Sequence, residues 1–196
     1  MARTNECERK TKETDVKISL NIDGSGKSIV ASGNGFFDHS LSLFTKHGLF
    51  DLELKCLGDI EVDFHHSAED IGITLGTAFK NALGNKKGII RYGVSFVPMD
   101  ETLVRVVLDL SGRCNLVYEE NLRDRIVNNF EVDLVFDFMK GFCDSLGLTL
   151  HIDILRSRNS HHAIEAIFKA LGRAMREAVS IDERAKNEIP STKGVL

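Results

Sequence analysis

A five-residue motif occurs twice in the chain, and this internal repeat limits the possible folds more than any other feature. Residues 65–69 read His-His-Ser-Ala-Glu, and residues 161–165 read His-His-Ala-Ile-Glu, 96 positions later (161 − 65). The same offset relates Gly76 to Gly172, which suggests two equivalent helices with small residues at close contacts. We therefore interpret the chain as a duplicated α/β half-domain, with halves at about 1–95 and 96–196.

Hydrophobic periodicity predicts strands and helices in both halves. Alternating apolar residues predict strands at 16–22, 52–54, 60–64, 92–97, 103–110, 116–118 and 148–154. Apolar residues at helical spacing predict helices at 36–47, 65–83, 130–146 and 161–180. The Asp-Gly-Ser-Gly segment at 23–26 predicts a hairpin turn, Gly84 predicts a helix C-cap, and residues 189–194 a terminal loop. Because strands and helices follow in the same order twice, we expect an α+β fold.

Composition and charge exclude several classes of protein. The net charge is −4, so the basic surface that is typical of nucleic-acid binding is not expected. No apolar run reaches the roughly 18 residues of a membrane span. The polar residues 1–15 lack the apolar stretch of a signal peptide. The four cysteines are scattered without a Cys-x-x-Cys pair, which is typical of reduced thiols in a cytoplasmic protein.

The repeated motif has the spacing of a metal site. On a helix, residues four apart share a face, so His65 and Glu69 project together while His66 points about a quarter-turn away. One motif can therefore offer two ligands to one metal and a third ligand to another. Imidazole and carboxylate ligands suit manganese, iron or zinc, and no cysteine is placed to favour a thiolate site. Because the motif occurs twice, in register with the apolar stripe, we predict two bound metals.

Each metal needs ligands from outside the two motifs. His39 lies 26 residues before His65 (65 − 39), and its repeat partner is expected at 135–138, where Asp137 is the candidate. Symmetry then predicts two ligand sets: His39, His66, His161 and Glu165, and His65, Glu69, Asp137 and His162. The partition between the metals stays open, and in a structural alternative Asp137 corresponds to Asp38. We expect ligands from different subunits, because a single helix cannot aim both faces inward.

Basic and hydroxyl side chains are candidates for binding a phosphate group. They are Arg91, Arg113, Lys169, Lys193 and Ser191. Lys169 lies one helical turn after Glu165 and is therefore expected to face the metal. His47 has two open interpretations, a substrate contact or a favourable interaction with the C-terminal end of its helix. The Gly-Ser-Gly-Lys-Ser segment at 24–28 lacks the first glycine and the following helix of a phosphate-binding loop, so we set it aside.

Nine short segments distributed along the chain resemble those of one family, the imidazoleglycerol-phosphate dehydratases. They are residues 35–39, 46–48, 58–60, 65–70, 91–93, 99–101, 109–113, 161–170 and 190–194. The resemblance runs from about residue 12 to residue 195, and the paired His-His motifs with the Ser-Thr-Lys-Gly tail are its most specific part. The chain departs from the family at Asp137, a position that is often histidine. A carboxylate also binds manganese, so Asp137 is kept as an expected ligand.

The resemblance implies a fold, an assembly and a binding site. Helices are expected to pack between two mixed four-stranded sheets in a duplicated fold. Two manganese ions per active site are expected, shared across the subunits of a 24-subunit shell of cubic symmetry. The substrate-binding positions that the family implies are Glu13, His39, His47, Arg91, Arg113, Lys169, Ser191 and Lys193. The length leaves no room for the phosphatase domain of the bifunctional forms, so a monofunctional enzyme is expected.

The implied activity is that of a hydro-lyase in histidine biosynthesis, which converts D-erythro-imidazole-glycerol phosphate into imidazole acetol phosphate. We expect manganese to hold both ring nitrogens of the substrate and to favour the imidazolate. The hydroxyl group then leaves through a diazafulvene-like intermediate, and a carboxylate removes the side-chain proton to give an enol that ketonises. Glu13 and Glu165, with Glu69 behind them, are the candidate acid–base residues. A binuclear metallohydrolase acting on a phosphorylated small molecule and a metal-storage protein are the alternatives.

Overall fold

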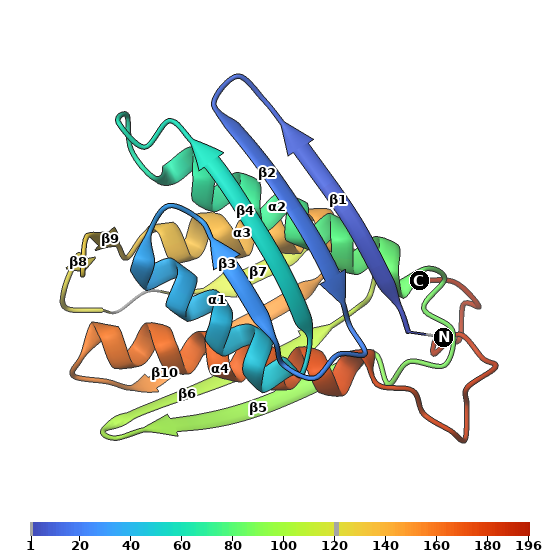
Figure 1. The fold of residues 1–196 in the computed structure, drawn as a ribbon. Helices are drawn as coiled ribbons and strands as arrows, with labels where there is room; N and C mark the ends of the chain where they lie inside the picture. Colours follow the sequence, from blue (N-terminus) through green and yellow to red (C-terminus); the bar gives the residue numbers. More distant parts are fainter. Residues whose placement is uncertain (1, 120–121) are drawn as a thin grey trace.

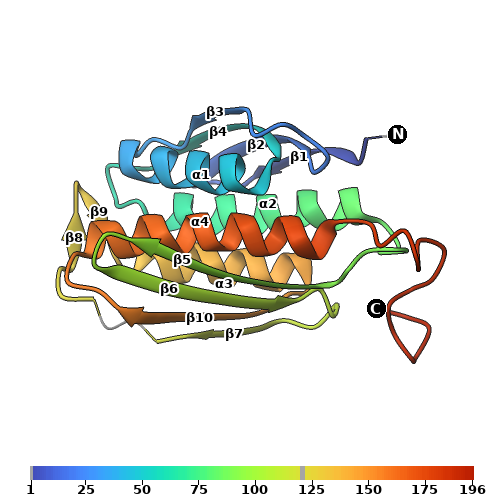
Figure 2. The same cartoon turned by 90° about the horizontal axis from the view of Figure 1, so that it is seen from below.

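In the part of the chain that the structure describes, four α-helices lie between two four-stranded sheets (Figure 1 and Figure 2). The computed structural model describes residues 2–119 and 122–196. The first half contains β1 (Thr4–Lys10), β2 (Thr14–Asn21), β3 (Ser28–Ala31), α1 (Gly35–Gly48), β4 (Asp51–Gly58) and α2 (His65–Leu83). The second half contains β5 (Tyr92–Met99), β6 (Thr102–Asp109), β7 (Asn115–Tyr118), β8 (Ile126–Val127), β9 (Phe130–Glu131), α3 (Leu134–Leu146), β10 (Thr149–Arg156) and α4 (Ser160–Val179). The predicted α+β fold is confirmed.

The two sheets have the same topology, which reflects the duplication. The strand order is β1-β2-β4-β3 in one sheet and β5-β6-β10-β7 in the other. In each sheet the last-named strand is parallel to its neighbour, and the other pairs are antiparallel. The halves differ between the third strand and the following helix. Residues 32–34 make this connection in the first half, whereas residues 119–133 make it in the second and include the β8–β9 hairpin.

Two glycines at matched positions allow the helices to approach closely. A Cβ atom on Gly76 of α2 would lie 2.5 Å from the carbonyl oxygen of Phe142 in α3. A Cβ atom on Gly172 of α4 would lie 2.4 Å from the carbonyl oxygen of Phe44 in α1. Any side chain at these positions would therefore push the helices apart. The small-residue stripe does mark close packing, with α2 on α3 and α4 on α1.

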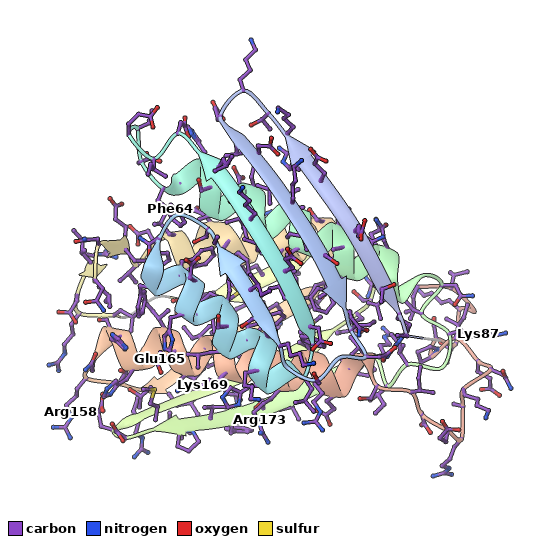
Figure 3. The ribbon with its side chains drawn as sticks, in the orientation of Figure 1. Phe64, Lys87, Arg158, Glu165, Lys169 and Arg173 are labelled. Carbon is purple, nitrogen blue, oxygen red and sulfur yellow. The ribbon has the colours of Figure 1, made fainter. Side chains whose placement is uncertain are left out.

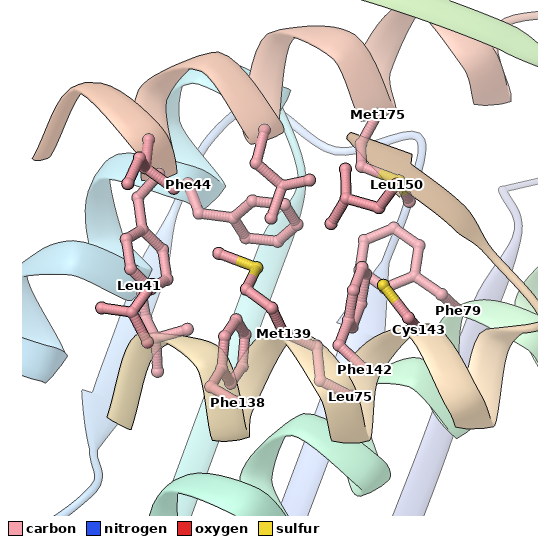
Figure 4. Close-up of a cluster of buried hydrophobic side chains, with 14 of the residues drawn as sticks. Leu41, Phe44, Leu75, Phe79, Phe138, Met139, Phe142, Cys143, Leu150 and Met175 are labelled. Atoms are coloured by element: carbon pink, nitrogen blue, oxygen red, sulfur yellow. The ribbon is translucent and has the colours of Figure 1, made fainter. Parts of the chain in front are cut away.

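The hydrophobic core fills the space between the sheets, where the helices are covered on both sides. Figure 4 shows aromatic and sulfur-containing side chains of α3 facing the other helices, among them Phe138, Met139 and Phe142. The Phe142 ring packs edge-on against Phe79 of α2, with centroids 5.7 Å apart. Each such buried side chain contributes about 1.5–3 kcal/mol of transfer free energy. This packing makes the helices a rigid platform for the residues at their ends.

The predicted strand at 60–64 is wrong. These residues form a turn in which the Val62 amide donates to the carbonyl oxygen of Asp59, 2.8 Å away. The side chains of Ile60 and Val62 are 58% and 65% exposed. Their alternation with acidic residues resembles the pattern of a half-buried strand. The turn ends at the start of α2, where the Asp63 carboxylate accepts a hydrogen bond from the backbone N–H of His65.

The predicted hairpin at residues 23–26 is also wrong, because β3 pairs with β4 rather than with β2. The segment crosses to the far side of β4 and is held by Asp51, whose carboxylate accepts the N–H groups of Ser25 and Lys27. No helix follows the segment, as expected from its lack of a complete phosphate-loop motif.

The start of one helix and one edge strand also differ from the sequence prediction. The helix that was expected from residue 130 begins at Leu134, because Phe130 belongs to β9. Phe130 is fully buried as part of the β8–β9 hairpin, so its apolar side chain does not mark the start of the helix. The edge strand β1 was not predicted, since its outward side chains are mostly polar. Among the described helices, none is both long and apolar enough to cross a membrane.

Candidate active site

All four helices begin at the same end of the molecule (Figure 1 and Figure 2). The predicted metal ligands lie in the first two turns of these helices, and we call this group the histidine end. It consists of His39, His65, His66, Glu69, Asp137, His161, His162 and Glu165. Side-chain caps help to place them. Asn159 accepts the backbone N–H groups of His161 and His162, which fixes the direction in which α4 starts.

The first cluster at the histidine end is centred on Glu165. Its Oε1 lies 2.8 Å from Nε2 of His39 and 3.0 Å from Nε2 of His161. Its Oε2 accepts a hydrogen bond of 2.8 Å from Lys169, one turn further along α4. Burial would raise the pKa of Glu165, but the hydrogen bonds from Lys169, His39 and His161 outweigh it and lower the pKa to about 2. Figure 3 shows Glu165, Lys169 and Arg173 following one another along α4.

The second cluster joins α2 and α3. Nδ1 of His65 lies 3.1 Å from Oδ2 of Asp137. Glu69 is exposed and lies one helical turn after His65 on the same helix. His65 and Asp137 line a cavity of about 500 Å³ together with the turn that precedes α2, including Val62 and Phe64. This cluster therefore opens onto a partly apolar hollow.

Internal symmetry makes Asp137 the counterpart of His39. Leu49 and Gly147 are the C-caps of α1 and α3, and both adopt left-handed backbone conformations, with φ of 56° and 71°. His39 and Asp137 each lie ten residues before these caps (49 − 39 and 147 − 137). The glycine contacts give the same register, since Phe44 and Phe142 occupy equivalent places. In this register Asp38 corresponds to Phe136, not to Asp137.

The second histidine of each motif points away from both clusters. Nδ1 of His66 lies 3.1 Å from Oδ2 of Asp59, and 3.9 Å from Oε2 of Glu13. Nδ1 of His162 lies 3.0 Å from Oε2 of Glu101. In the first predicted ligand set, His39, His161 and Glu165 form a cluster, and only His66 lies outside it. In the second set, His162 lies outside the cluster in the same way.

These contacts shift the pKa values of the groups involved. The hydrogen bond with Asp59 raises the pKa of His66. The hydrogen bond with His162 lowers the pKa of Glu101 to about 2. Within the described residues, His162, Glu101 and Asp100 form a group whose potential ligand atoms all lie within 4.8 Å of one another. Sequence reasoning did not select these two acidic residues or Asp59, although Glu101 directly precedes its strand as Glu13 does.

The predicted phosphate-binding residues lie at the other end of the helices, except for Lys169. We call Arg91, Arg113, Ser191 and Lys193 the basic end. The backbone N–H of Arg91 donates to the carbonyl oxygen of Ala178, in the last turn of α4. Because a helix rises 1.5 Å per residue, this point is about 20 Å along α4 from Glu165. Arg113 follows Gly112, whose N–H bonds the carbonyl oxygen of Gly147 at the end of α3.

At the basic end, Arg91 is held by an acidic partner. Its Nε and Nη2 donate to the two oxygens of Asp109 at 2.7 and 3.0 Å. Its Nη1 donates to the carbonyl oxygen of Pro190 at 2.7 Å, which ties the tail to β5. His47 lies at the C-terminal end of α1, where burial and then the charges of Lys169 and Arg173 lower its pKa. A neutral His47 gains little from the helix dipole.

Paired imidazole–carboxylate clusters on a duplicated α+β scaffold are typical of enzymes that transfer protons or use metal ions to act on small molecules. The family model for imidazoleglycerol-phosphate dehydratase matches residues 32–175. The imidazoleglycerol-phosphate dehydratase of Thermoanaerobacter sp. is 56% identical over 194 residues, covering 99% of this chain and 100% of the relative. The corresponding protein of Cupriavidus taiwanensis is 53% identical with the same coverage.

Solved structures agree with these relatives. The imidazoleglycerol-phosphate dehydratase of Staphylococcus aureus superposes with a TM-score of 0.82 at 38% identity, covering 91% of this chain and 100% of that one. The structure from Pyrococcus furiosus gives a TM-score of 0.82 at 36% identity, covering 96% and 99%. The chain belongs to the imidazoleglycerol-phosphate dehydratase family. It is a hydro-lyase of histidine biosynthesis that acts on a phosphorylated imidazole, and the metallohydrolase alternative finds no support.

Proposed function

We propose that the histidine end binds two manganese ions per active site and that this makes the dehydration manganese-dependent. The observation that carries the proposal is the pair of symmetry-related clusters, one around Glu165 and one around Asp137. Each combines imidazole with carboxylate and neither contains a thiolate, which is a donor set suited to manganese. The ligand pool remains the eight residues of the histidine end. His66 and His162, which we call the outward histidines, complete the clusters of neighbouring subunits.

Bound manganese would supply Lewis-acid chemistry at the imidazole ring of the substrate. The protein groups then divide the remaining tasks. Glu165 is held ionised by Lys169 and His39, and a pKa of about 2 makes it a weak base and a good anionic ligand. We therefore assign proton removal to Glu13, which is exposed in the β1–β2 turn. Glu69 remains the second candidate for proton removal.

The elimination breaks one C–H and one C–O bond of the glycerol chain. The carboxylate of Glu13 accepts the proton from the second carbon from the ring. The hydroxyl group on the carbon next to the ring takes up one proton from solvent and leaves as water, and a C=C bond forms between the two carbons. The enol that results ketonises to imidazole acetol phosphate. Arg113, Lys193 and Ser191 bind the phosphate by charge-assisted hydrogen bonds, together with Arg91.

We propose that the active site is shared between subunits of a large oligomer, with the 24-subunit shell as the expected form. The separation of about 20 Å between the two ends is longer than a glycerol chain can bridge. The histidine end of one subunit must therefore meet the basic end of another. The outer face of β5 offers a surface for such contacts, since Tyr92, Val94 and Phe96 are each at least half exposed. Four free cysteines support a cytoplasmic location.

An assay of water loss from imidazoleglycerol phosphate, with and without manganese, tests the proposal. Activity should disappear after chelation and return when manganese is added. Light scattering on the same samples should show a smaller particle after chelation. Full activity in metal-free protein would contradict the metal proposal, and a monomer of unchanged size that binds manganese would contradict the shared site.

A further inference from the structure

Two carboxylates outside the ligand pool face the outward histidines. Asp59 places Oδ2 3.1 Å and Oδ1 3.2 Å from Nδ1 of His66. Glu101 places Oε2 3.0 Å from Nδ1 of His162. A neutral imidazole carries its proton on one nitrogen only, and a carboxylate can only accept a hydrogen bond. Both contacts therefore favour the tautomer that is protonated on Nδ1 and leaves the lone pair of Nε2 free.

The two halves reach the same contact by different routes. Asp59 lies in the loop between β4 and α2, where its backbone N–H donates to the carbonyl oxygen of Glu13 at 3.1 Å. Glu101 lies in the turn between β5 and β6. With the register of the helix C-caps, the counterpart of Asp59 is Ser157, which bonds Thr102 and not a histidine. Glu13, which precedes β2 as Glu101 precedes β6, lies 3.9 Å from Nδ1 of His66, beyond hydrogen-bond distance, so Asp59 supplies this contact in the first half.

Glu101 is itself fixed in place. Its Oε1 accepts hydrogen bonds from the hydroxyl of Thr102 at 3.1 Å and from the backbone N–H of Arg158 at 3.4 Å. The other oxygen is left for His162. Asp100 is 79% exposed and lies 3.9 Å from Nε2 of this histidine, too far for a hydrogen bond. Among the described side chains, none therefore lies within hydrogen-bond distance of Nε2 of His162.

We propose that Asp59 and Glu101 are positioning residues that hold His66 and His162 with Nε2 aimed at the metal of a neighbouring subunit. The inference rests on the proposed metal sites and adds the two groups that prepare the shared ligands. Metal-binding histidines commonly donate their other N–H to a carboxylate, which fixes the ring and makes it a stronger ligand. His65 also turns Nδ1 to a carboxylate, but its partner Asp137 belongs to the ligand pool.

Substitution of the two carboxylates tests the proposal through metal affinity. Glu101→Ala and Asp59→Ala should each weaken manganese binding by about 10- to 100-fold. Glu101→Gln keeps a carbonyl acceptor for Nδ1–H and should lose less than Glu101→Ala. Glu53→Gln removes an exposed carboxylate of β4 and serves as the matched control. The metal-free variants should still unfold in one cooperative transition, which separates positioning from a loss of folding.

The tautomers can be measured directly in metal-free protein with ¹⁵N-labelled histidine. Long-range ¹H–¹⁵N spectra should show Nδ1–H for His66 and His162 in the wild type, and a mixture of tautomers in the alanine variants. Nε2–H in the wild type, or manganese affinity that is unchanged in both alanine variants, would overturn the proposal. Loss of one whole ion in Glu101→Gln would instead make Glu101 a ligand and also overturn it. Wild type that binds no manganese but shows both Nδ1–H tautomers would overturn the metal proposal and the positioning role with it, and only the tautomer assignment would stand.

Discussion

The two ends of the helices differ in how their functional groups are supported. At the histidine end, the groups lie on helices that are packed between two sheets, and they already contact one another, as Glu165 contacts His39. At the basic end, Ser191 and Lys193 lie on the tail, and Arg91 is paired with Asp109. The histidine end is therefore preorganised by the packed helices, whereas the basic end is held by loops. Neither end contains the groups for the whole reaction.

The largest effect is expected from removing the carboxylate at the centre of the first cluster. Glu165→Gln keeps the shape of the side chain but removes the charge that His39 and Lys169 face. Activity should fall by about 10³-fold, because the ion that is lost supplies several kcal/mol of transition-state stabilisation. One ion per subunit should be missing in metal analysis. Wild-type metal content together with wild-type activity would show that the cluster is structural.

A large effect is also expected at Asp137, where the two clusters differ. Asp137→Ala should remove about one of the two ions per subunit and most of the activity, because it removes an oxygen ligand. Asp137→His should restore metal binding and shift the preference of that cluster towards nickel or copper, since imidazole is a softer ligand. Two ions in Asp137→Ala, with assembly intact, would exclude Asp137 from the site.

A moderate effect is expected at the basic end. Arg113→Ala or Lys193→Ala removes a charge-assisted hydrogen bond worth about 1.5–3 kcal/mol, which corresponds to an increase in KM of about 10- to 100-fold. Metal content should stay at the wild-type value, because these residues lie at the opposite end of the helices. Steady-state kinetics and metal analysis on the same preparations check both statements. Equal binding of dephosphorylated substrate by the wild type would contradict the assignment.

A separate effect, on stability rather than on activity, is expected in acid. The pKa of Glu165 is lowered to about 2 in the folded protein, from an ordinary value of 4.5. The unfolded chain therefore binds the proton first, and the stabilisation is present above pH 4.5 and lost as the pH falls towards 2. The loss is about 3 kcal/mol. Urea unfolding of metal-free wild type and Glu165→Gln should converge over this range, and a constant difference would contradict the origin of the shift.

The internal repeat and the apolar periodicity predicted most of the fold, and the repeat selected eight candidate ligands that the fold brings to one end of the helices. The His-His motifs were found because helical spacing is a local property, and His39 and Asp137 because duplication predicts a partner. Asp59 and Glu101 were not found, since a loop and a turn bring them to histidines far away in the sequence. The distance between the histidine end and the basic end could not be predicted either, because it depends on how the helices align.

A mixing experiment tests the shared site most directly. Subunits with Glu165→Gln are inactive at the histidine end, and subunits with both Arg113→Ala and Lys193→Ala are impaired at the basic end. In a mixed oligomer with equal amounts, about a quarter of the sites should combine two intact ends and regain activity. If the site were contained in one chain, the mixture would show only the average activity of the two parent variants.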